Sequence, residues 1–385
     1  MHLKVCDLTQ FYSPYSGGVR RYLEQKRQYC RAAGHTHVLI VPGQKTERLE
    51  EEHARTYFIR SPLVSKNSRY RALLNLNAVE EVLEREQPDI LESSDPYQIA
   101  WKALASGQAL RIPVVAFYHS HFPEAYFRTT VKYLGETATY VAMEIAKNYV
   151  RSLYSRFVCT FVPSEGLAHV LQEWGVENII LTELGVSTEI YQRRPDKFAT
   201  RITLGIPADR FLLLYVGRLA PEKNVRTLFQ AFEELSGKEQ GKFHLMVVGD
   251  GPMRDQLIEL QKKTGAVSWL RYCSDQEGLA RIYRAADLFV HPSVQETFGL
   301  VALESQACGT PVVGIRGSYM DRIIFADQSH WTSENSAASL ASAITATART
   351  DLERAGIEAS SRVAKRYSWE QVFARMFDIY AKIRG

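Results

Sequence analysis

Two glutamates flank a glycine-containing turn in the segment LFVHPSVQETFGLVALESQACGTPVVG. Its pattern predicts a strand that ends at His291, a short loop, and a helix that begins around Gly299. Free N–H groups and the helix dipole at such a start bind phosphate. Glu296 lies in the loop and Glu304 about one and a half turns into the helix, where both carboxylates can accept hydrogen bonds from hydroxyl groups. The segment therefore predicts a site for an anion that carries sugar or ribose hydroxyls.

Two cations follow the buried apolar run FLLLYVG. Arg218 and Lys223 flank an Ala-Pro-Glu turn after Gly217, and Asn224 is a plausible N-cap for the next helix. Both cations come at the carboxyl end of a predicted strand, where open α/β sheets bind ligands. Together they are suited to hold a diphosphate and to neutralise the charge that develops on it as a leaving group.

The N-terminal half contributes a glycine pair and a histidine pair. Gly17 and Gly18 precede a predicted helix, and two glycines allow the backbone to approach a phosphate. His119 and His121 follow the run PVVAFY and lie on the same side if that strand continues. The glycines do not form G-x-G-x-x-G, and no third ligand of suitable spacing accompanies the histidines. We therefore expect no bound metal.

Each of these features also has a plainer interpretation. A glutamate near a helix start is favourable for the dipole alone, although Glu304 lies past the first turn among apolar neighbours. An isolated arginine and lysine in a loop are more often solvated, and a glycine pair equally serves as a turn. The shared position of Arg218, Lys223 and Glu296 at strand ends of one half favours the functional interpretation.

Strand-like and helix-like segments alternate along both halves, which predicts βαβ units and parallel sheets. The runs FLLLYVG, HLMVVGDG and DLFVHPS are apolar throughout, as in strands that are covered on both faces. The fold class is therefore α/β with two doubly wound domains. The polar segment 185–200 contains Gly and Pro and indicates a linker, so we expect domains at 1–187 and 188–368, with the boundary near Ser187.

The composition fits such a protein. With 45% hydrophobic and 23% charged residues in 385, the chain resembles neither a disordered protein nor a coiled coil. The five cysteines are scattered without a C-x-x-C pair, which favours a reducing cytoplasm over a disulfide scaffold. A run of about 18 apolar residues, as a spanning helix requires, does not occur. The net charge of +4 is too small to indicate nucleic acid.

Basic residues gather locally in the N-terminal half, although its total charge is near neutral. One interpretation is a solvated helix face, and the other is contact with an anionic lipid or acceptor. The first group faces only one acid, Glu24, and consists of Arg20, Arg21, Lys26, Arg27 and Arg31. The second lies in a stretch without acids and consists of Arg55, Arg60, Lys66, Arg69 and Arg71.

Several of these motifs resemble one family. SGGVRRY, AFYHSH, VGRLAPEKN, VVGDGP and above all ETFGLVALE before ACGTPVV are similar to the retaining glycosyltransferases of family four. The resemblance covers nearly the whole chain, and its most specific element is E-x7-E, Glu296 to Glu304. It implies the GT-B fold: two Rossmann-like domains that face a cleft, with a final helix, 369–385, that crosses back to the N-terminal domain. It also implies an acceptor-binding N-terminal domain and a nucleotide-sugar-binding C-terminal domain.

The resemblance implies a role for each matching residue. Glu296 and the backbone of Thr297, Phe298, Gly299 and Leu300 would hold the donor sugar and phosphate, and Glu304 the ribose. Arg218 and Lys223 would hold the diphosphate, with His119 near the donor sugar. The early glycines would approach the diphosphate and the GDGP turn would shape the base pocket; these are Gly17 and Gly18, and Gly249, Gly251 and Pro252. One departure is EKN in place of the common EKG, which affects the turn.

The implied reaction is transfer of a hexose, of mannose or glucose type, with retained anomeric configuration. No carboxylate is evident as a covalent nucleophile, so we expect front-face displacement without a metal or cofactor. The nucleotide of the donor, which is UDP, GDP or ADP, stays open. So does the acceptor, which is a glycan, a glycolipid or a lipid-linked sugar, with Asp95 and His121 as acceptor-side candidates. We expect a cytoplasmic protein, with peripheral contact with anionic membrane on the inner face as an open alternative.

Other functions use similar folds. A nucleotide-sugar epimerase or hydrolase would need acids and bases in a different pattern around the sugar, and E-x7-E argues against it. A nucleotide-sugar-binding module without turnover is the alternative that is not an enzyme. A dehydrogenase is disfavoured because no dinucleotide fingerprint with a following acidic residue occurs after any predicted strand.

Overall fold

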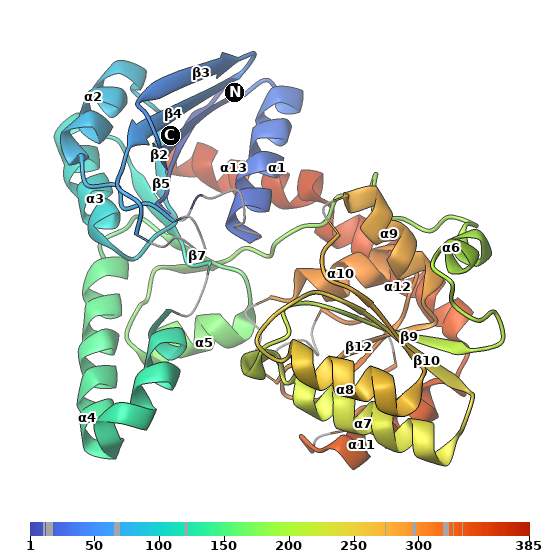
Figure 1. Cartoon of the computed structure of the whole chain (residues 1–385). Helices are drawn as coiled ribbons and strands as arrows, with labels where there is room; N and C mark the ends of the chain where they lie inside the picture. Colours follow the sequence, from blue (N-terminus) through green and yellow to red (C-terminus); the bar gives the residue numbers. More distant parts are fainter. Residues whose placement is uncertain are drawn as a thin grey trace. The chain divides into compact units, whose positions relative to one another are not determined.

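The chain forms two compact units in a computed structural model (Figure 1). Unit 1 is Met1–Leu184 with Trp369–Gly385, and unit 2 is Gly185–Ser368. The structure describes the chain except residues 11, 13–17, 65–69, 120–121, 274, 295–297, 319–322, 326 and 333, and except the side chains of 122–136. Across these described residues, no helix combines the length and the apolar character that crossing a membrane requires.

A mostly parallel sheet forms the middle of unit 1. Its described strands are β1 (Lys4–Leu8), β2 (Thr36–Gly43), β3 (Glu47–Glu51), β4 (Ala54–Arg60), β5 (Ile90–Ser93), β6 (Val114–Phe117), β7 (Thr160–Val162) and β8 (Ile179–Leu181). They lie in the order β3-β4-β2-β1-β5-β6-β7-β8, and β3 pairs antiparallel with β4 whereas the other neighbours are parallel. The central strands are covered on both faces, and apolar residues such as Leu8, Ile40 and Leu91 are fully buried.

Helices connect these strands. They are α1 (Gly18–Ala33), α2 (Leu76–Glu86), α3 (Gln98–Leu110), α4 (Phe122–Tyr154), α5 (Glu165–Glu173) and the C-terminal α13 (Trp369–Arg384). Short polar side chains start two of them: Asn75 accepts from the backbone N–H of Ala78 at α2, and Ser164 accepts from that of Leu167 at α5. Helix α1 packs against α13, which brings the last residues of the chain to unit 1.

The basic residues of α1 are not one solvated face. Lys26 is fully buried, and the structure corrects its placement on a charged surface. Arg27 pairs with Glu51 at 2.9 Å and Arg31 with Glu52 at 3.3 Å. Both glutamates lie at the β3–β4 hairpin, which the sequence pattern did not predict, so they add to Glu24 of α1, which also pairs with Arg27 at 2.7 Å.

Unit 2 holds a second, fully parallel sheet. Its described strands, β9 (Phe211–Val216), β10 (Phe243–Val248), β11 (Val267–Leu270), β12 (Leu288–His291) and β13 (Val312–Gly314), lie in the order β11-β10-β9-β12-β13. The described helices are α6 (Lys197–Thr203), the 3-10 turn η1 (Pro221–Lys223), α7 (Val225–Lys238), α8 (Arg254–Thr264), α9 (Gln276–Ala285), α10 (Leu300–Ala307), α11 (Ala337–Thr347) and α12 (Leu352–Tyr367). Both units are thus Rossmann-like, as the sequence predicted.

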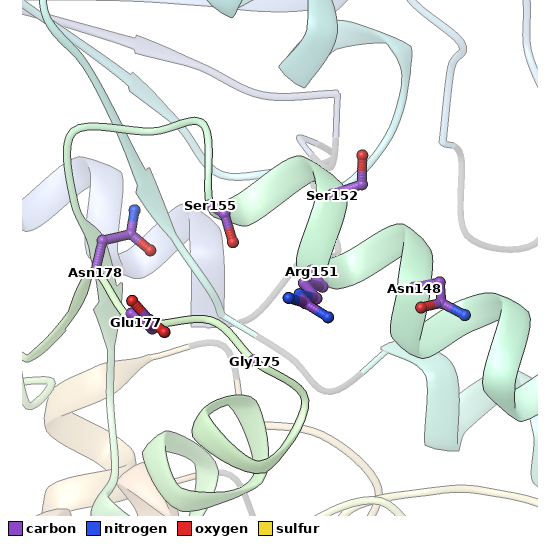
Figure 2. A pocket seen from close by; sticks show the side chains of 7 residues that line it. All are labelled: Asn148, Arg151, Ser152, Ser155, Gly175, Glu177 and Asn178. Carbon is purple, nitrogen blue, oxygen red and sulfur yellow. The ribbon is translucent and has the colours of Figure 1, made fainter.

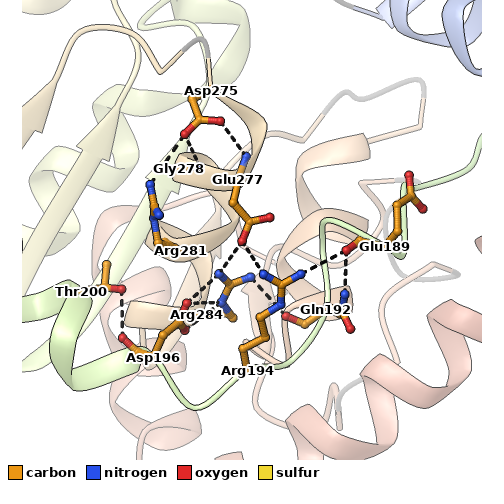
Figure 3. Close-up of polar contacts among 10 residues, drawn as sticks. All are labelled: Glu189, Gln192, Arg194, Asp196, Thr200, Asp275, Glu277, Gly278, Arg281 and Arg284. Atoms are coloured by element: carbon orange, nitrogen blue, oxygen red, sulfur yellow. Dashed lines mark hydrogen bonds and ion pairs between the residues drawn. The ribbon is translucent and has the colours of Figure 1, made fainter.

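An ion-pair network fixes the start of unit 2 to α9 (Figure 3). The side chain of Arg284 is 2% exposed, and its guanidinium binds both oxygens of Asp196 at 2.6–2.9 Å. Glu277 accepts from Arg284 at 3.2 Å and from Arg194 at 2.8 Å. Bidentate arginine–carboxylate pairs are geometrically specific. The predicted linker, 185–200, is therefore held to unit 2 at Arg194 and Asp196.

Candidate functional site

The carboxyl end of β9 carries both predicted cations. Arg218 is 68% exposed and lies 3.5 Å from Glu222, and Lys223 ends η1. The hydroxyl of Tyr215 donates to the backbone oxygen of Arg218 at 3.0 Å. Both cations therefore lie at the end of a buried strand, and a hydrogen bond from Tyr215 of β9 fixes the backbone at Arg218.

Asn224 joins this loop to the neighbouring strand end. Its backbone is left-handed, with φ 53°, which explains why glycine also suits this position. It stands at the predicted N-cap of α7, where its Oδ1 accepts from the hydroxyl of Thr227 at 2.8 Å and not from a backbone N–H. Its amide donates to the backbone oxygen of Pro292 at 2.8 Å and to Asn335 Oδ1 at 2.7 Å. The departure from EKG thus adds a polar link between the loops after β9 and β12.

The GDGP turn after β10 approaches the same loop closely. A Cβ on Gly249 would lie 1.9 Å from the backbone oxygen of Gly217, and one on Gly251 would lie 2.4 Å from that of Leu219. Leu219 donates to the backbone oxygen of Asp250 and accepts from the N–H of Met253. Only glycine fits at both positions, so the turn that begins at Gly249 and includes Pro252 is locked against the loop of Arg218 and Lys223.

The loop after β12 leads into α10, as the sequence predicted. Strand β12 ends at His291, and α10 begins at Leu300 with Gly299 at its N-cap, φ 76°. Phe298, beside this start, is 4% exposed. Glu296 and Thr297 lie outside the described residues, so their predicted roles stay predictions.

Glu304 is held deep in unit 2. Glu304 is 2% exposed, and its Oε2 accepts from the hydroxyl of Tyr283 at 3.0 Å. Burial and the nearby Glu304 carboxylate hold the pKa of Tyr283 well above its usual range, so this hydroxyl stays a donor. The sequence did not identify Tyr283, because an aromatic residue at a buried helix position predicts core packing.

His119 follows β6 in unit 1 and is enclosed by aromatic rings. Its ring stacks on Phe117 at 4.1 Å and 13°, and meets the ring of Tyr22 at 4.9 Å and 68°. Burial lowers its pKa to about 3, so the imidazole is neutral near pH 7. The buried Nε2 atom has no hydrogen-bond partner in the part of the chain that the structure describes, which leaves it available to a ligand.

Asp95 lies at the same edge of the sheet, after β5. It is 2% exposed, and its Oδ2 accepts from the backbone N–H of Gln10, which follows β1. Because β1, β5 and β6 are adjacent and parallel, Gln10, Asp95 and His119 share one carboxyl edge. Gly17 and His121 lie outside the described residues, and Gly18 is the first residue of α1.

A separate polar cavity of about 530 Å³ lies elsewhere in unit 1 (Figure 2). Its lining includes Arg151 and Ser155 near the end of α4, and Glu177 and Asn178 before β8. These segments lead into β7 and β8, so the cavity lies at the amino ends of the strands. The motifs of the sequence did not predict this cavity.

A metal centre is not formed by the described side chains. No group of three His, Cys, Asp or Glu residues that could hold an ion lies among them.

Comparisons with known proteins agree along most of the chain. Residues 16–190 match the model of Glycosyltransferase Family 4 and residues 196–361 that of Glycosyl transferases group 1. A GDP-mannose-dependent alpha-(1-6)-phosphatidylinositol dimannoside mannosyltransferase of Mycobacterium tuberculosis is 31% identical over 97% of this chain and 95% of its own. The protein is a family four glycosyltransferase.

Other relatives of this glycosyltransferase extend the comparison. A GDP-mannose-dependent alpha-mannosyltransferase of Corynebacterium glutamicum is 27% identical over 82% of this chain and 72% of its own. An alpha-monoglucosyldiacylglycerol synthase of Streptococcus pneumoniae is 25% identical over 84% and 73%.

Solved structures share the fold of the glycosyltransferase. Sucrose-phosphate synthase from Thermosynechococcus elongatus matches with a TM-score of 0.76 at 21% identity, covering 99% of each chain. HepE of Anabaena, solved with UDP-glucose, matches with a TM-score of 0.74 at 16% identity, covering 99% of this chain and 100% of its own. The predicted GT-B fold class is confirmed. So is the predicted activity: this glycosyltransferase is an enzyme that transfers a hexose from a nucleotide-sugar with retention.

Proposed function

We propose that the enzyme transfers a mannosyl group from GDP-mannose to a hydroxyl of a glycolipid headgroup. The observation that carries this proposal is the 31% identity, over nearly both full chains, to an enzyme named for GDP-mannose and a phosphatidylinositol dimannoside. The second relative named for GDP-mannose supports the same donor.

Unit 2 is proposed to bind the donor, within the predicted domain 188–368. Glu304 would accept from the ribose hydroxyls, and the backbone of Gly249, Gly251 and Pro252 would shape the base pocket. Arg218 and Lys223 would hold the diphosphate. Glu296 and the backbone from Thr297 to Leu300 are assigned to the donor sugar and phosphate on the motif that they match. The close loop packing after β9 and β10 supports a rigid pocket there.

In the proposed mechanism, positioning and charge do the catalysis. The bond from C1 of the hexose to the diphosphate breaks, and the acceptor oxygen attacks from the same face. The departing phosphate takes the acceptor's proton and develops charge, which Arg218 and Lys223 would balance without a metal. His119, assigned to the donor sugar, would act as a neutral hydrogen-bonding group.

Residues 1–187 with 369–385 are proposed to bind the acceptor. Ser94 is 6% exposed, and its Oγ has no hydrogen-bond partner among the described residues; the same holds for the buried Oε1 of Gln10. Buried polar atoms are normally satisfied, so a hydroxyl-rich headgroup near Asp95 would complete this edge. His121 is an acceptor-side candidate by its motif.

A membrane surface is the proposed source of the lipid acceptor, with the enzyme at the inner face of the cytoplasmic membrane. Helix α4 supports this, because it exposes Tyr140, Val141 and Ile145 by 67, 52 and 65%. Sedimentation with vesicles tests the contact: binding that does not increase with anionic lipid would contradict it.

A donor panel tests the proposed specificity. Melting temperatures are measured in EDTA with GDP-mannose, UDP-glucose and ADP-glucose, for the wild type and for Glu304→Gln. We expect GDP-mannose to give the largest rise in the wild type and a clearly smaller one in the variant, because ligand binding stabilises the folded state by mass action. A rise with UDP-glucose alone would replace the donor, and a response that needs added metal would contradict the metal-free mechanism.

A further inference from the structure

A buried charge cluster connects α13 to the strand edge of unit 1. Lys26 of α1 lies 2.9 Å from Asp7 Oδ1 of β1 and 3.2 Å from Glu92 Oε2 of β5. All three side chains are 0% exposed. Lys26 also donates to the hydroxyl of Tyr380 on α13 at 3.0 Å, and that hydroxyl in turn donates to Glu92. One lysine, two carboxylates and one tyrosine thus fix four elements together.

Tyr22 connects this cluster to the strand edge. Its hydroxyl donates to Glu92 Oε1 at 2.9 Å and lies 3.3 Å from the sulfur of Met376 on α13. Its ring lies 5.0 Å from that of Phe117 and 4.9 Å from that of His119. Tyr22 therefore touches the cluster with one end and the histidine with its ring.

The surroundings leave His119 few orientations. Phe117 covers one face of its ring, and Tyr22 meets the ring edge-on. Two rings of α13, Trp369 and Phe373, pack on Tyr22 at 6.2 and 5.5 Å. A shift of Tyr22 would therefore let the imidazole turn, because interiors are close-packed and transmit strain.

We propose that Tyr22 is a positioning residue for His119 and that Tyr380 of α13 sets Tyr22 through the shared carboxylate of Glu92. The C-terminal helix then orients a reaction group as well as stabilising unit 1. The consequence for transfer rests on the proposed function of His119. The coupling of the side chains does not.

Nuclear magnetic resonance tests the coupling without turnover. The protein is labelled at histidine Cε1, and the His119 signal is assigned by its loss in His119→Gln. In the wild type we expect a nuclear Overhauser effect between His119 Hε1 and the Tyr22 ring. Tyr22→Phe and Tyr380→Phe, which remove one hydroxyl each, are expected to move the His119 signal. Either variant serves if the other does not fold.

Tyr29→Leu is the matched control. Tyr29 lies on α1 and packs on Phe373 and Phe377 of α13 at 5.6 and 5.0 Å, without a hydrogen bond to Glu92 in the structure as described. It is expected to lower the melting temperature while the His119 signal stays at its wild-type position. The proposal would be overturned if the wild type shows no Overhauser effect between His119 and Tyr22. It would also be overturned if the His119 signal stays at its wild-type position in both Tyr22→Phe and Tyr380→Phe.

Kinetics of the same variants separate the two proposals. We expect Tyr380→Phe to lower kcat on the order of tenfold with little change in donor KM, as for a displaced reaction group. A moved His119 signal with wild-type kcat would support the coupling and contradict the role of His119 in the proposed function.

Discussion

At the scale of single residues, the enzyme's candidate groups differ in charge because their surroundings differ. Burial makes His119 neutral, whereas Arg218 stands exposed and charged at its strand end. Glu304 lies buried beside a tyrosine hydroxyl that cannot ionise near neutral pH. Positive charge for a departing diphosphate can therefore come from Arg218 and Lys223 and not from the histidine.

Removing either cation tests this division of charge. Arg218→Ala and Lys223→Ala are each expected to lower kcat by about 10²-fold, the usual cost of losing one donor to a transition state. Steady-state kinetics with saturating donor measure it. Arg254→Ala, at an exposed arginine on α8 that lies 3.7 Å from Asp255, is the control and should stay within about twofold. Near-wild-type kcat in either cation variant would remove the assigned role.

At the scale of elements, close backbone approach builds the proposed donor pocket. The loops after β9 and β10 fit together only because glycine occupies positions 249 and 251. Asn224 then ties the first of these loops to the backbone after β12. The pocket's rigidity thus depends on contacts between strand ends that lie far apart in the chain.

Gly251→Ala is expected to damage donor binding more than folding. Its new methyl group would meet the backbone oxygen of Leu219 at 2.4 Å, which displaces the loop of Arg218 and Lys223. We expect donor affinity to fall on the order of tenfold, measured by calorimetric titration with GDP-mannose, since a shift of this kind misplaces the bound groups.

The matched control is Gly237→Ala in α7. Nothing lies within 4 Å of its added Cβ, and alanine is favoured over glycine inside a helix by about 0.5–1 kcal/mol. Its affinity should equal that of the wild type and its melting temperature should rise. Equal donor affinity in Gly251→Ala would contradict the close-approach argument.

The buried cluster under α13 predicts how unit 1 responds to pH. Burial, with the negative charge of Asp7 adding to it, outweighs the opposing positive charge of Lys26 and raises the pKa of Glu92 to about 7. The folded state then holds a proton that the unfolded chain releases near the ordinary glutamate pKa of about 4.3. This contribution to stability is fully present below that value and is lost as pH rises through about 7.

Urea unfolding across pH 4 to 8 measures this contribution. We expect the free energy of unfolding to fall less with rising pH in Glu92→Gln than in the wild type, because the amide cannot ionise. A parallel pH dependence of the two proteins would contradict the raised pKa.

The sequence predicts some of these elements well and others not at all. Apolar runs gave β9, β10 and β12, and the strand–loop–helix pattern around Glu304 gave α10. The edge strand β3 and its neighbour β4 carry ERLEE and ARTYFIR, in which charged residues hide the strand period. Tyr22, Tyr283 and Tyr380 could not be predicted as partners of carboxylates, because their pairings join residues far apart in the sequence.

At the scale of the whole molecule, two Rossmann-like units share one chain, and α13 returns to unit 1. The family four membership accounts for this duplicated architecture, since both family models match, one in each half. The relatives' names include a phosphatidylinositol dimannoside mannosyltransferase and an alpha-monoglucosyldiacylglycerol synthase.

The stereochemistry of the product tests the central claim most directly. Purified enzyme is incubated in EDTA with GDP-α-mannose and phosphatidylinositol dimannoside in detergent, and the product's one-bond C1–H1 coupling is measured. We predict an α-linked mannosyl product that Arg218→Ala forms about 10²-fold more slowly. A β-linked product, or release of free mannose without transfer to the lipid, would contradict the account.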